Sequence, residues 1–155
     1  MQGFAKCARL FVGLVSITCS AAGVSTATEP DSQISSLRAA AECGSVDASF
    51  NLGVMYEHSD GVPENLPEAV KYYRQAAEAG DYRAQNNLGW ILHKGKGVPR
   101  DDIEADMWLR LAIKSASPIR SRLCLFYVEM LMSRHDVEQA QKLVDQWRIK
   151  PIVSK

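Results

Sequence analysis

The sequence lacks almost every residue pattern that carries chemistry. Its 155 residues include only three histidines, His58, His93 and His135. No His-Glu-x-x-His, phosphate-binding loop, Gly-x-Ser-x-Gly or Cys-x-x-Cys motif occurs, and the histidines fall at expected helix ends in different parts of the chain, not around one metal ion. The 18 basic residues balance the 18 acidic residues, so no basic excess indicates a nucleic-acid partner. We therefore expect no enzymatic activity, no metal and no cofactor.

Long apolar runs are also missing, apart from one near the N-terminus. Lys6 and Arg9 precede an apolar segment from Leu10 to about Cys19, and small residues then lead to Ala27. This order is typical of a secretory signal peptide, and the apolar core is shorter than the ~20 residues of a spanning helix. We expect residues 1–27 to be removed and the mature chain to be periplasmic or secreted, with no membrane span. A retained membrane anchor is the alternative.

Cysteine is scarce in the rest of the chain. Cys7 and Cys19 lie in the expected signal peptide, which leaves Cys43 and Cys124. These two lie more than two repeat units apart in the register given below. Repeat units touch only their neighbours, whereas a disulfide needs Cα atoms within about 7 Å. Both cysteines also align with positions that are expected to pack, so we predict two buried thiols without a disulfide.

What the sequence does contain is an internal repeat. Asn51-Leu52-Gly53 recurs as Asn87-Leu88-Gly89, and Gly61-Val62-Pro63 recurs as Gly97-Val98-Pro99, a shift of 36 residues. Within each unit, apolar residues recur at helical spacing in two stretches that glycines separate. Asn65 with Glu68 has the spacing of a capping box at the start of a second helix, and Asp101 with Glu104 repeats it. Each unit is therefore predicted to be a pair of helices.

The repeat predicts an all-α, antiparallel helix-hairpin solenoid of about seven helices: one N-terminal helix and three pairs. We expect a polar lead-in at 28–33, a first helix near Ile34 to Cys43, and a repeat domain over 34–150. The repeat units would span about 45–80, 81–116 and 117–150, the last a degenerate capping unit. Its first helix would start at Ser117-Pro118 and reach about Met132. Its second helix, from Val137 to Arg148, would bury Ala140, Leu143, Val144 and Trp147.

These residues resemble the Sel-1-like repeat family, a relative of the tetratricopeptide repeat. The resemblance covers about Ala40 to Ala116 and is carried by Ala48-x-x-x-Leu52-Gly53-x-Met55-Tyr56, Gly61-Val62-Pro63, Ala69, Tyr72, Ala76-Ala77 and Gly80. Ser59 departs from the pattern, since the second unit has Gly95 there, and we expect Gly61 to end the first helix of that unit.

The resemblance implies a monomeric protein–protein interaction module, an adaptor or regulator that binds a peptide segment or helix of an envelope protein in its concave groove. One alternative is a β-lactamase-like or penicillin-binding envelope hydrolase, because a cysteine-rich branch of the family has been so described. This chain lacks that branch's cysteine pairs and a Ser-x-x-Lys motif. The other alternative is a structural component of a secretion or polysaccharide-assembly complex.

By the same resemblance, the first helix of each pair lines the concave face. Its expected binding residues are Phe50, Asn51, Val54, Glu57, Asn86, Asn87, Trp90, His93, Lys94, Arg122 and Phe126. Asn51 and Asn87 either hold an extended peptide backbone, because an amide donates and accepts hydrogen bonds, or satisfy neighbouring helix ends. For Trp90 and Phe126 we favour the groove floor over the core.

Overall fold

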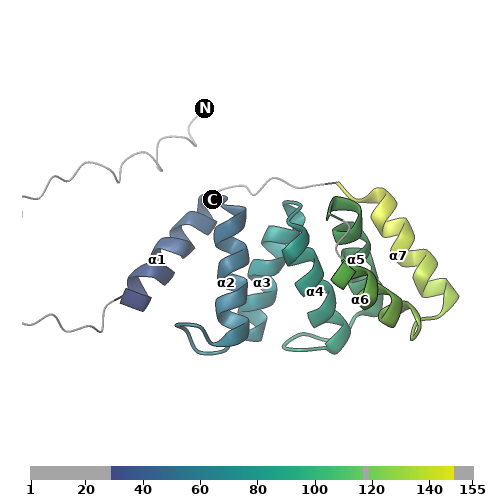
Figure 1. Ribbon diagram of the computed structural model, residues 1–155, viewed down its shortest axis with the longest axis horizontal. Helices are drawn as coiled ribbons and strands as arrows, with labels where there is room; N and C mark the ends of the chain where they lie inside the picture. The colour runs from purple at the N-terminus through teal and green to yellow at the C-terminus, as the bar shows by residue number, and fades with distance from the viewer. Residues whose placement is uncertain (1–28, 117–118, 149–155) are drawn as a thin grey trace, which may run out of the picture.

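The computed structural model describes residues 29–116 and 119–148, and within these ranges every regular element is a helix (Figure 1). The helices are α1 (Glu29–Glu42), α2 (Val46–His58), α3 (Leu66–Glu78), α4 (Tyr82–Lys94), α5 (Asp102–Ala116), α6 (Ile119–Glu129) and α7 (Arg134–Gln146). Successive helices from α1 to α6 pack against one another in chain order. The predicted all-α solenoid of seven helices is confirmed for this part of the chain.

Several expectations fall partly or wholly outside the described residues. These are the signal peptide at 1–27, the helix start at Ser117-Pro118 and the end of the repeat domain at 149–150. Among the helices that the structure describes, none has the length and apolar character needed to cross a membrane.

Side-chain caps set the starts of the second helix in each of the first two units. The Asn65 Oδ1 accepts a hydrogen bond from the Glu68 backbone N–H at 3.2 Å, and Asp101 accepts one from Glu104 at 2.9 Å. The reciprocal half of the predicted capping box does not form. Instead, the Asn65 N–H donates to the Tyr56 carbonyl oxygen at 3.0 Å, and the Asp101 N–H likewise donates back to α4. The loop is thereby closed onto the preceding helix, which leaves both glutamates available for other partners.

Two glycines allow the helices of the first two units to approach closely. A Cβ atom on Gly53 of α2 would lie 2.6 Å from the ring of Tyr73 on α3, and one on Gly89 of α4 would lie 2.9 Å from Leu109 on α5. No side chain fits in either place, since real Cβ contacts are longer than this. The position that follows in the 36-residue register is Leu125 of α6.

The third pair of helices differs from the expected hairpin. Helices α6 and α7 each pack against α5 and make little contact with each other. A hollow of about 370 Å³ lies between them, lined by Leu125 of α6 and Val144 of α7 among other residues. The expectation of a third close hairpin is therefore wrong. At the position where the earlier units have glycine, α6 carries Leu125, which lines this hollow.

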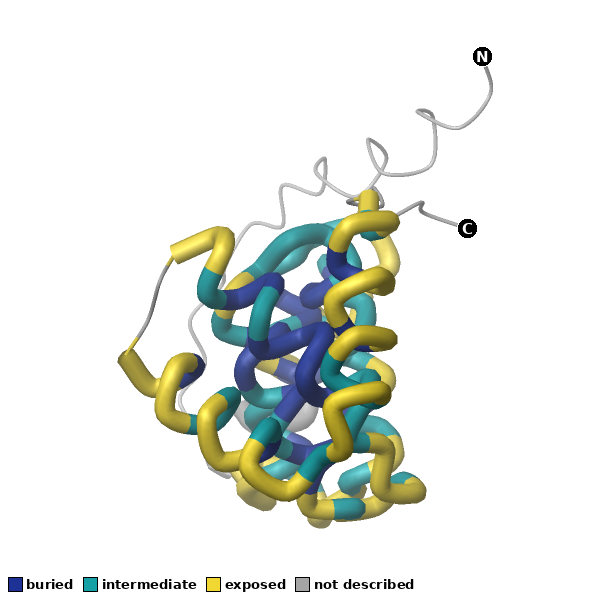
Figure 2. Tube along the Cα trace, turned by 90° about the vertical axis from the view of Figure 1, so that its right-hand side faces the viewer, coloured by how far each residue is buried: buried dark blue, intermediate teal, exposed yellow. Residues whose placement is uncertain are grey.

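The core runs along the row of helices, and its largest fully buried side chain is Trp108 of α5. Seen from the α7 end, buried residues fill the interior between exposed outer turns (Figure 2). Trp108 meets the half-buried Trp147 edge to face at 4.8 Å between ring centroids, which anchors the end of α7. Ala140 and Val144 of α7 are buried as predicted, whereas Leu143 is 41% exposed. Its predicted burial is wrong because α7 contacts α5 along a narrow stripe.

Some predicted boundaries also shift. The segment expected as a polar lead-in is helical from Glu29, and α6 ends at Glu129 before the predicted Met132. Ser59, not Gly61, takes the left-handed conformation directly after α2, with φ 59°, as Gly95 does after α4 with φ 64°. The serine therefore takes over the glycine's place at the end of the helix.

The two cysteines are not joined by a disulfide, but their predicted burial is wrong. Cys43 is exposed and lies directly after the end of α1. Its counterparts in the register, Ala79 and Ser115, also lie at helix ends and are half-buried and exposed. Cys124 is half-buried although its counterparts in α2 and α4 are fully buried leucines. The difference again arises in α6, which α7 does not cover. Burial raises the pKa of the Cys124 thiol, so it is not an activated nucleophile.

Candidate functional site

The outward positions of α2, α4 and α6 form one surface, which we call the groove face. Exposed or half-buried residues recur on the three helices at 36-residue spacing. They make four rows: Asp47, Arg83 and Ile119; Asn51, Asn87 and Leu123; Val54, Trp90 and Phe126; and His58, Lys94 and Met130. The composition changes along the solenoid. On α2 and on α4 three of the four positions are polar or charged, whereas the four positions on α6 and the turn directly after it are all apolar.

A cleft of about 240 Å³ indents the groove face. Its walls come from α2, α4 and α6 together, with Phe50 on α2 and Arg120 on α6 at opposite sides; the other lining residues are Tyr82, Arg83, Asn86 and Asn87. Because three helices border one hollow, the first helices of the three units share a recessed surface.

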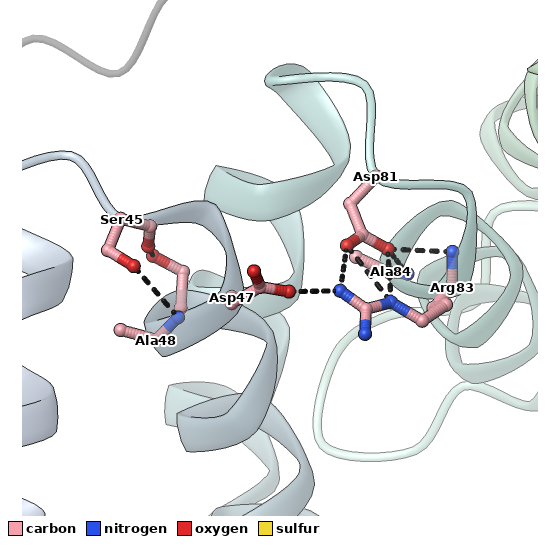
Figure 3. A network of polar contacts seen from close by, with 7 residues as sticks. Ser45, Asp47, Ala48, Asp81, Arg83 and Ala84 are labelled. Carbon is pink, nitrogen blue, oxygen red and sulfur yellow. Dashed lines mark hydrogen bonds and ion pairs between the residues drawn. The ribbon is translucent and has the colours of Figure 1, made fainter.

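Arg83 connects the starts of α2 and α4 at the edge of this cleft (Figure 3). Its guanidinium binds Asp81, the N-cap of α4, and reaches Asp47 in the first turn of α2 at 2.5 Å. The hydrogen bonds that Arg83 donates to Asp81 and then to Asp47 hold the pKa of Arg83 above its usual value. The guanidinium also lies 4.4 Å from the centroid of the Phe50 ring. These contacts fix one wall of the cleft.

The asparagine pair lies on the same part of the groove face. The side chain of Asn51 is exposed and makes no hydrogen bond within the described part of the chain, while the Asn87 side-chain oxygen accepts one from Asn86 at 3.4 Å. The nearby helix starts are capped by other side chains, Ser45 for α2 and Asp81 for α4. The starts of α2 and α4 therefore do not depend on these amides. Binding of a peptide backbone stays a prediction.

An aromatic cluster forms the other part of the groove face. The rings of Trp90 on α4 and Tyr127 on α6 lie 6.4 Å apart, and the ammonium of Lys94 lies 4.4 Å from the first ring and 5.2 Å from the second. His93 packs below, edge-on to Tyr127, with its Nδ1 2.8 Å from Asp102. Trp90 itself is half-buried.

Charge beneath the cluster is balanced locally. Burial would raise the pKa of Asp102, but hydrogen bonds from Arg100 and His93 outweigh this effect and lower that pKa below its usual value. The carboxylate is thus committed to a structural contact. Within the described residues, no three histidine, cysteine, aspartate or glutamate side chains gather as metal ligands would.

The expected exposure of some predicted binding residues is wrong. Asn86 is 5% exposed, because its side-chain oxygen accepts from the Ser121 hydroxyl at 2.9 Å where α6 packs on α4. His93 is 4% exposed and bound to Asp102. Glu57 is half-buried and accepts a hydrogen bond from the Tyr73 hydroxyl at 2.7 Å. These three side chains hold helices together, and their role in binding stays a prediction.

The remaining predicted binding residues are exposed or half-buried: Phe50, Asn51, Val54, Asn87, Trp90, Lys94, Arg122 and Phe126. Their role in binding stays a prediction. Sequence reasoning missed Ile119, Arg83 and Tyr127. The 36-residue register contained the signal for the first two, since both align with the exposed Asp47.

Comparison with known proteins identifies the repeat. A family model described as Sel1 repeat matches residues 46–81 and 83–117. The crystal structure of c5321, a protective antigen of uropathogenic Escherichia coli strains displaying an SLR fold, is 31% identical with a TM-score of 0.71 and covers 74% of this chain. A Sel1 repeat protein from Oxalobacter formigenes is 30% identical with a TM-score of 0.58 and covers 67%. The chain spans only 24% and 41% of the lengths of these two proteins. Among curated proteins, none matches the chain.

Proposed function

Because the chain is a Sel1-like repeat helical protein, we propose that it is an exported adaptor or regulator that binds a segment of an envelope protein on its groove face. Sel1 repeat proteins are generally protein–protein interaction modules, and their fold is typically a non-catalytic scaffold. The partner would bind on the groove face, and binding would take place in the cell envelope.

One observation carries the choice of site. Eight large apolar side chains are exposed in the described part of the chain, and six of them lie between Ile119 and Leu131, on α6 and the turn after it. Scattered exposed apolar residues are ordinary, but a cluster on one face is typical of a protein-binding surface. This cluster borders Trp90 and the cleft, so the apolar and polar parts of the groove face are continuous.

The proposal of export rests on the sequence before residue 28. A basic start, a short apolar core and small residues ending near Ala27 support removal of a signal peptide. Material recovered from the envelope or the medium should have the intact mass of a chain that begins near Thr28. A full-length mass there would contradict removal of the signal.

Photo-crosslinking in native cells tests the binding site. A photoreactive residue placed at Asn51 or Leu123 of the groove face should trap the same envelope protein from both positions. Glu138 and Lys142 serve as matched controls, because they are equally exposed but lie on α7. Trapping that is as efficient from α7 as from the groove face would overturn the proposed site.

A further inference from the structure

The outer face of α6 points to a specific kind of partner. Resting on the proposed function, we propose that this face docks an acidic amphipathic helix of another protein. Ile119, Leu123, Phe126 and Met130, which we call the α6 row, are 64–75% exposed. At 100° per residue they fall within an arc of about 60°, over roughly 16 Å of helix. The α6 row is thus a narrow, straight apolar stripe with nothing over it in the described residues.

The spacing of the α6 row fits a helix as its occupant. Side chains at i, i+4, i+7 and i+11 form the ridge by which one helix packs against another, with axes 8–10 Å apart. On the α4 side, the 42% exposed Tyr127 and the half-buried Trp90 lie next to the row, with ring centroids 6.4 Å apart. These two rings, which we call the side wall, border the row, so a helix that rests on α6 would contact them.

The charges around the α6 row select the sign of the partner. Helical geometry places Arg122 along one flank and Arg120 along the other, and Lys94 of α4 lies at the edge of the wall. Arg120 and Lys94 make no ion pair within the described part of the chain. The acidic residue on the flank, Glu129, is bonded to Arg110 of α5. A helix with carboxylates beside its apolar stripe would therefore find the unpaired positive charges of Arg120 on α6 and Lys94 on α4.

The same charges disfavour two other occupants. Pairing of two α6 rows in a dimer would bring basic flanks against basic flanks. The chain's own residues 149–155 carry Lys150 and Lys155 without an acidic residue, and Pro151 would break a helix there. An anionic membrane surface matches the charge, but a flat bilayer is poorly matched to an apolar stripe about 60° wide beside a recessed cleft.

Fluorescence anisotropy with a designed peptide tests the docking site. The probe is a labelled helical peptide of about 14 residues with leucine at i, i+4, i+7 and i+11 and glutamate at the flanking positions. Its control has lysine in place of each glutamate. The purified protein should bind the glutamate peptide at least about tenfold more tightly than the lysine peptide, and added salt should reduce the difference. Equal affinity for the two peptides, or binding of neither, overturns the proposal.

Variants locate the binding on α6. Phe126→Ala should weaken binding of the glutamate peptide about tenfold or more, and Arg120→Gln about threefold. The controls are Leu143→Ala and Lys142→Gln on α7, which should change it less than twofold. Equal losses from the α7 variants would overturn the assignment to α6.

The other occupants give distinct results. A dimer in sedimentation that Phe126→Ala dissolves would show a second copy on the row. A large gain in peptide affinity after removal of residues 149–155 would show the chain's own segment there. Binding of phosphatidylglycerol vesicles that is lost in Phe126→Ala, without peptide binding, would show a membrane surface. Each of these results overturns the proposal. The proposed function fails separately, because crosslinking from Asn51 does not depend on the α6 row.

Discussion

The first two repeat units and the last one use the same helical register with opposite results. In the first two, a glycine on one helix lets a bulky side chain of its partner approach, and the helices bury each other's apolar faces. In the last, Leu125 replaces the glycine, α7 rests on α5, and α6 keeps its apolar side chains on the outside. The two pairs that close have glycine at this position, whereas the open pair has leucine and leaves apolar surface exposed.

The largest effect is expected from a tryptophan in the closed region. Trp108→Ala should lower the free energy of unfolding by about 3–5 kcal/mol, because Trp108 is 1% exposed and carries the contact to α7. Trp90→Ala is the matched substitution on the groove face and should cost less than about 2 kcal/mol, since Trp90 is only half-buried. Urea unfolding of both variants measures the difference. Equal losses would place Trp90 in the core and remove the aromatic cluster from the groove face.

The role of Gly53 in the close packing of α2 and α3 can be tested directly. Gly53→Ala should lower the free energy of unfolding by about 2 kcal/mol despite alanine's better helix propensity, because the added methyl group would meet the buried ring of Tyr73. Leu125→Ala, at the equivalent position of α6, should cost less than about 1 kcal/mol because Leu125 borders a hollow. The same urea titration measures both. A stabilised Gly53→Ala protein would mean that the glycine does not close the pair.

An ion pair between the first two units sets the next prediction. Glu104 of α5 accepts hydrogen bonds from Arg74 of α3 and from the Trp108 indole. Burial would raise the pKa of Glu104, but these hydrogen bonds outweigh it and lower that pKa below its usual value. A lowered folded-state pKa stabilises the fold above the unfolded pKa of about 4.3, and this stabilisation is lost as the pH falls through the folded pKa.

Glu104→Gln should therefore cost about 1 kcal/mol at pH 7, a value kept small because Arg74 is partly exposed. The variant should also lose less stability than the unaltered protein between about pH 5 and pH 3. Glu68→Gln is the control, since its pair with Lys71 is exposed and lies within one helix. Parallel acid titrations of the two variants would argue against a role for the ion pair at the junction.

The smallest effect is expected in the loops that follow the first helices of the closed units. Ser59 holds a left-handed conformation that glycine holds at residue 95, and this conformation costs a residue with a side chain about 1–2 kcal/mol. Ser59→Gly should raise the free energy of unfolding by about 0.5–1 kcal/mol. Glycine removes the conformational strain, but it loses more backbone entropy on folding, which offsets part of the gain. The reverse change, Gly95→Ser, should lower it by a similar amount. A lower melting temperature for Ser59→Gly, or a higher one for Gly95→Ser, would contradict the assignment of the two caps.

Much of the fold was predictable from the sequence, and the exceptions have physical causes. The 36-residue register is local information, so it gave the helices, the caps at Asn65 and Asp101 and most rows of the groove face. It could not show that α6 packs on α4 through Ser121 and buries Asn86, because that contact joins side chains of different units. Nor did similarity of position show that Cys124 would be only half-buried. Its burial depends on whether α7 covers α6, and these two helices make little contact with each other.

The most direct measurement is the free energy of unfolding of the double variant Leu123→Gln, Phe126→Gln. Both side chains are more than 60% exposed, and glutamine is a good helix former. If the α6 row is a surface kept for another protein, the double variant should unfold in urea within about 0.5 kcal/mol of the unaltered protein. A loss of more than about 2 kcal/mol would show that these side chains belong to the folded chain's own core, and the docking face on α6 would have to be abandoned.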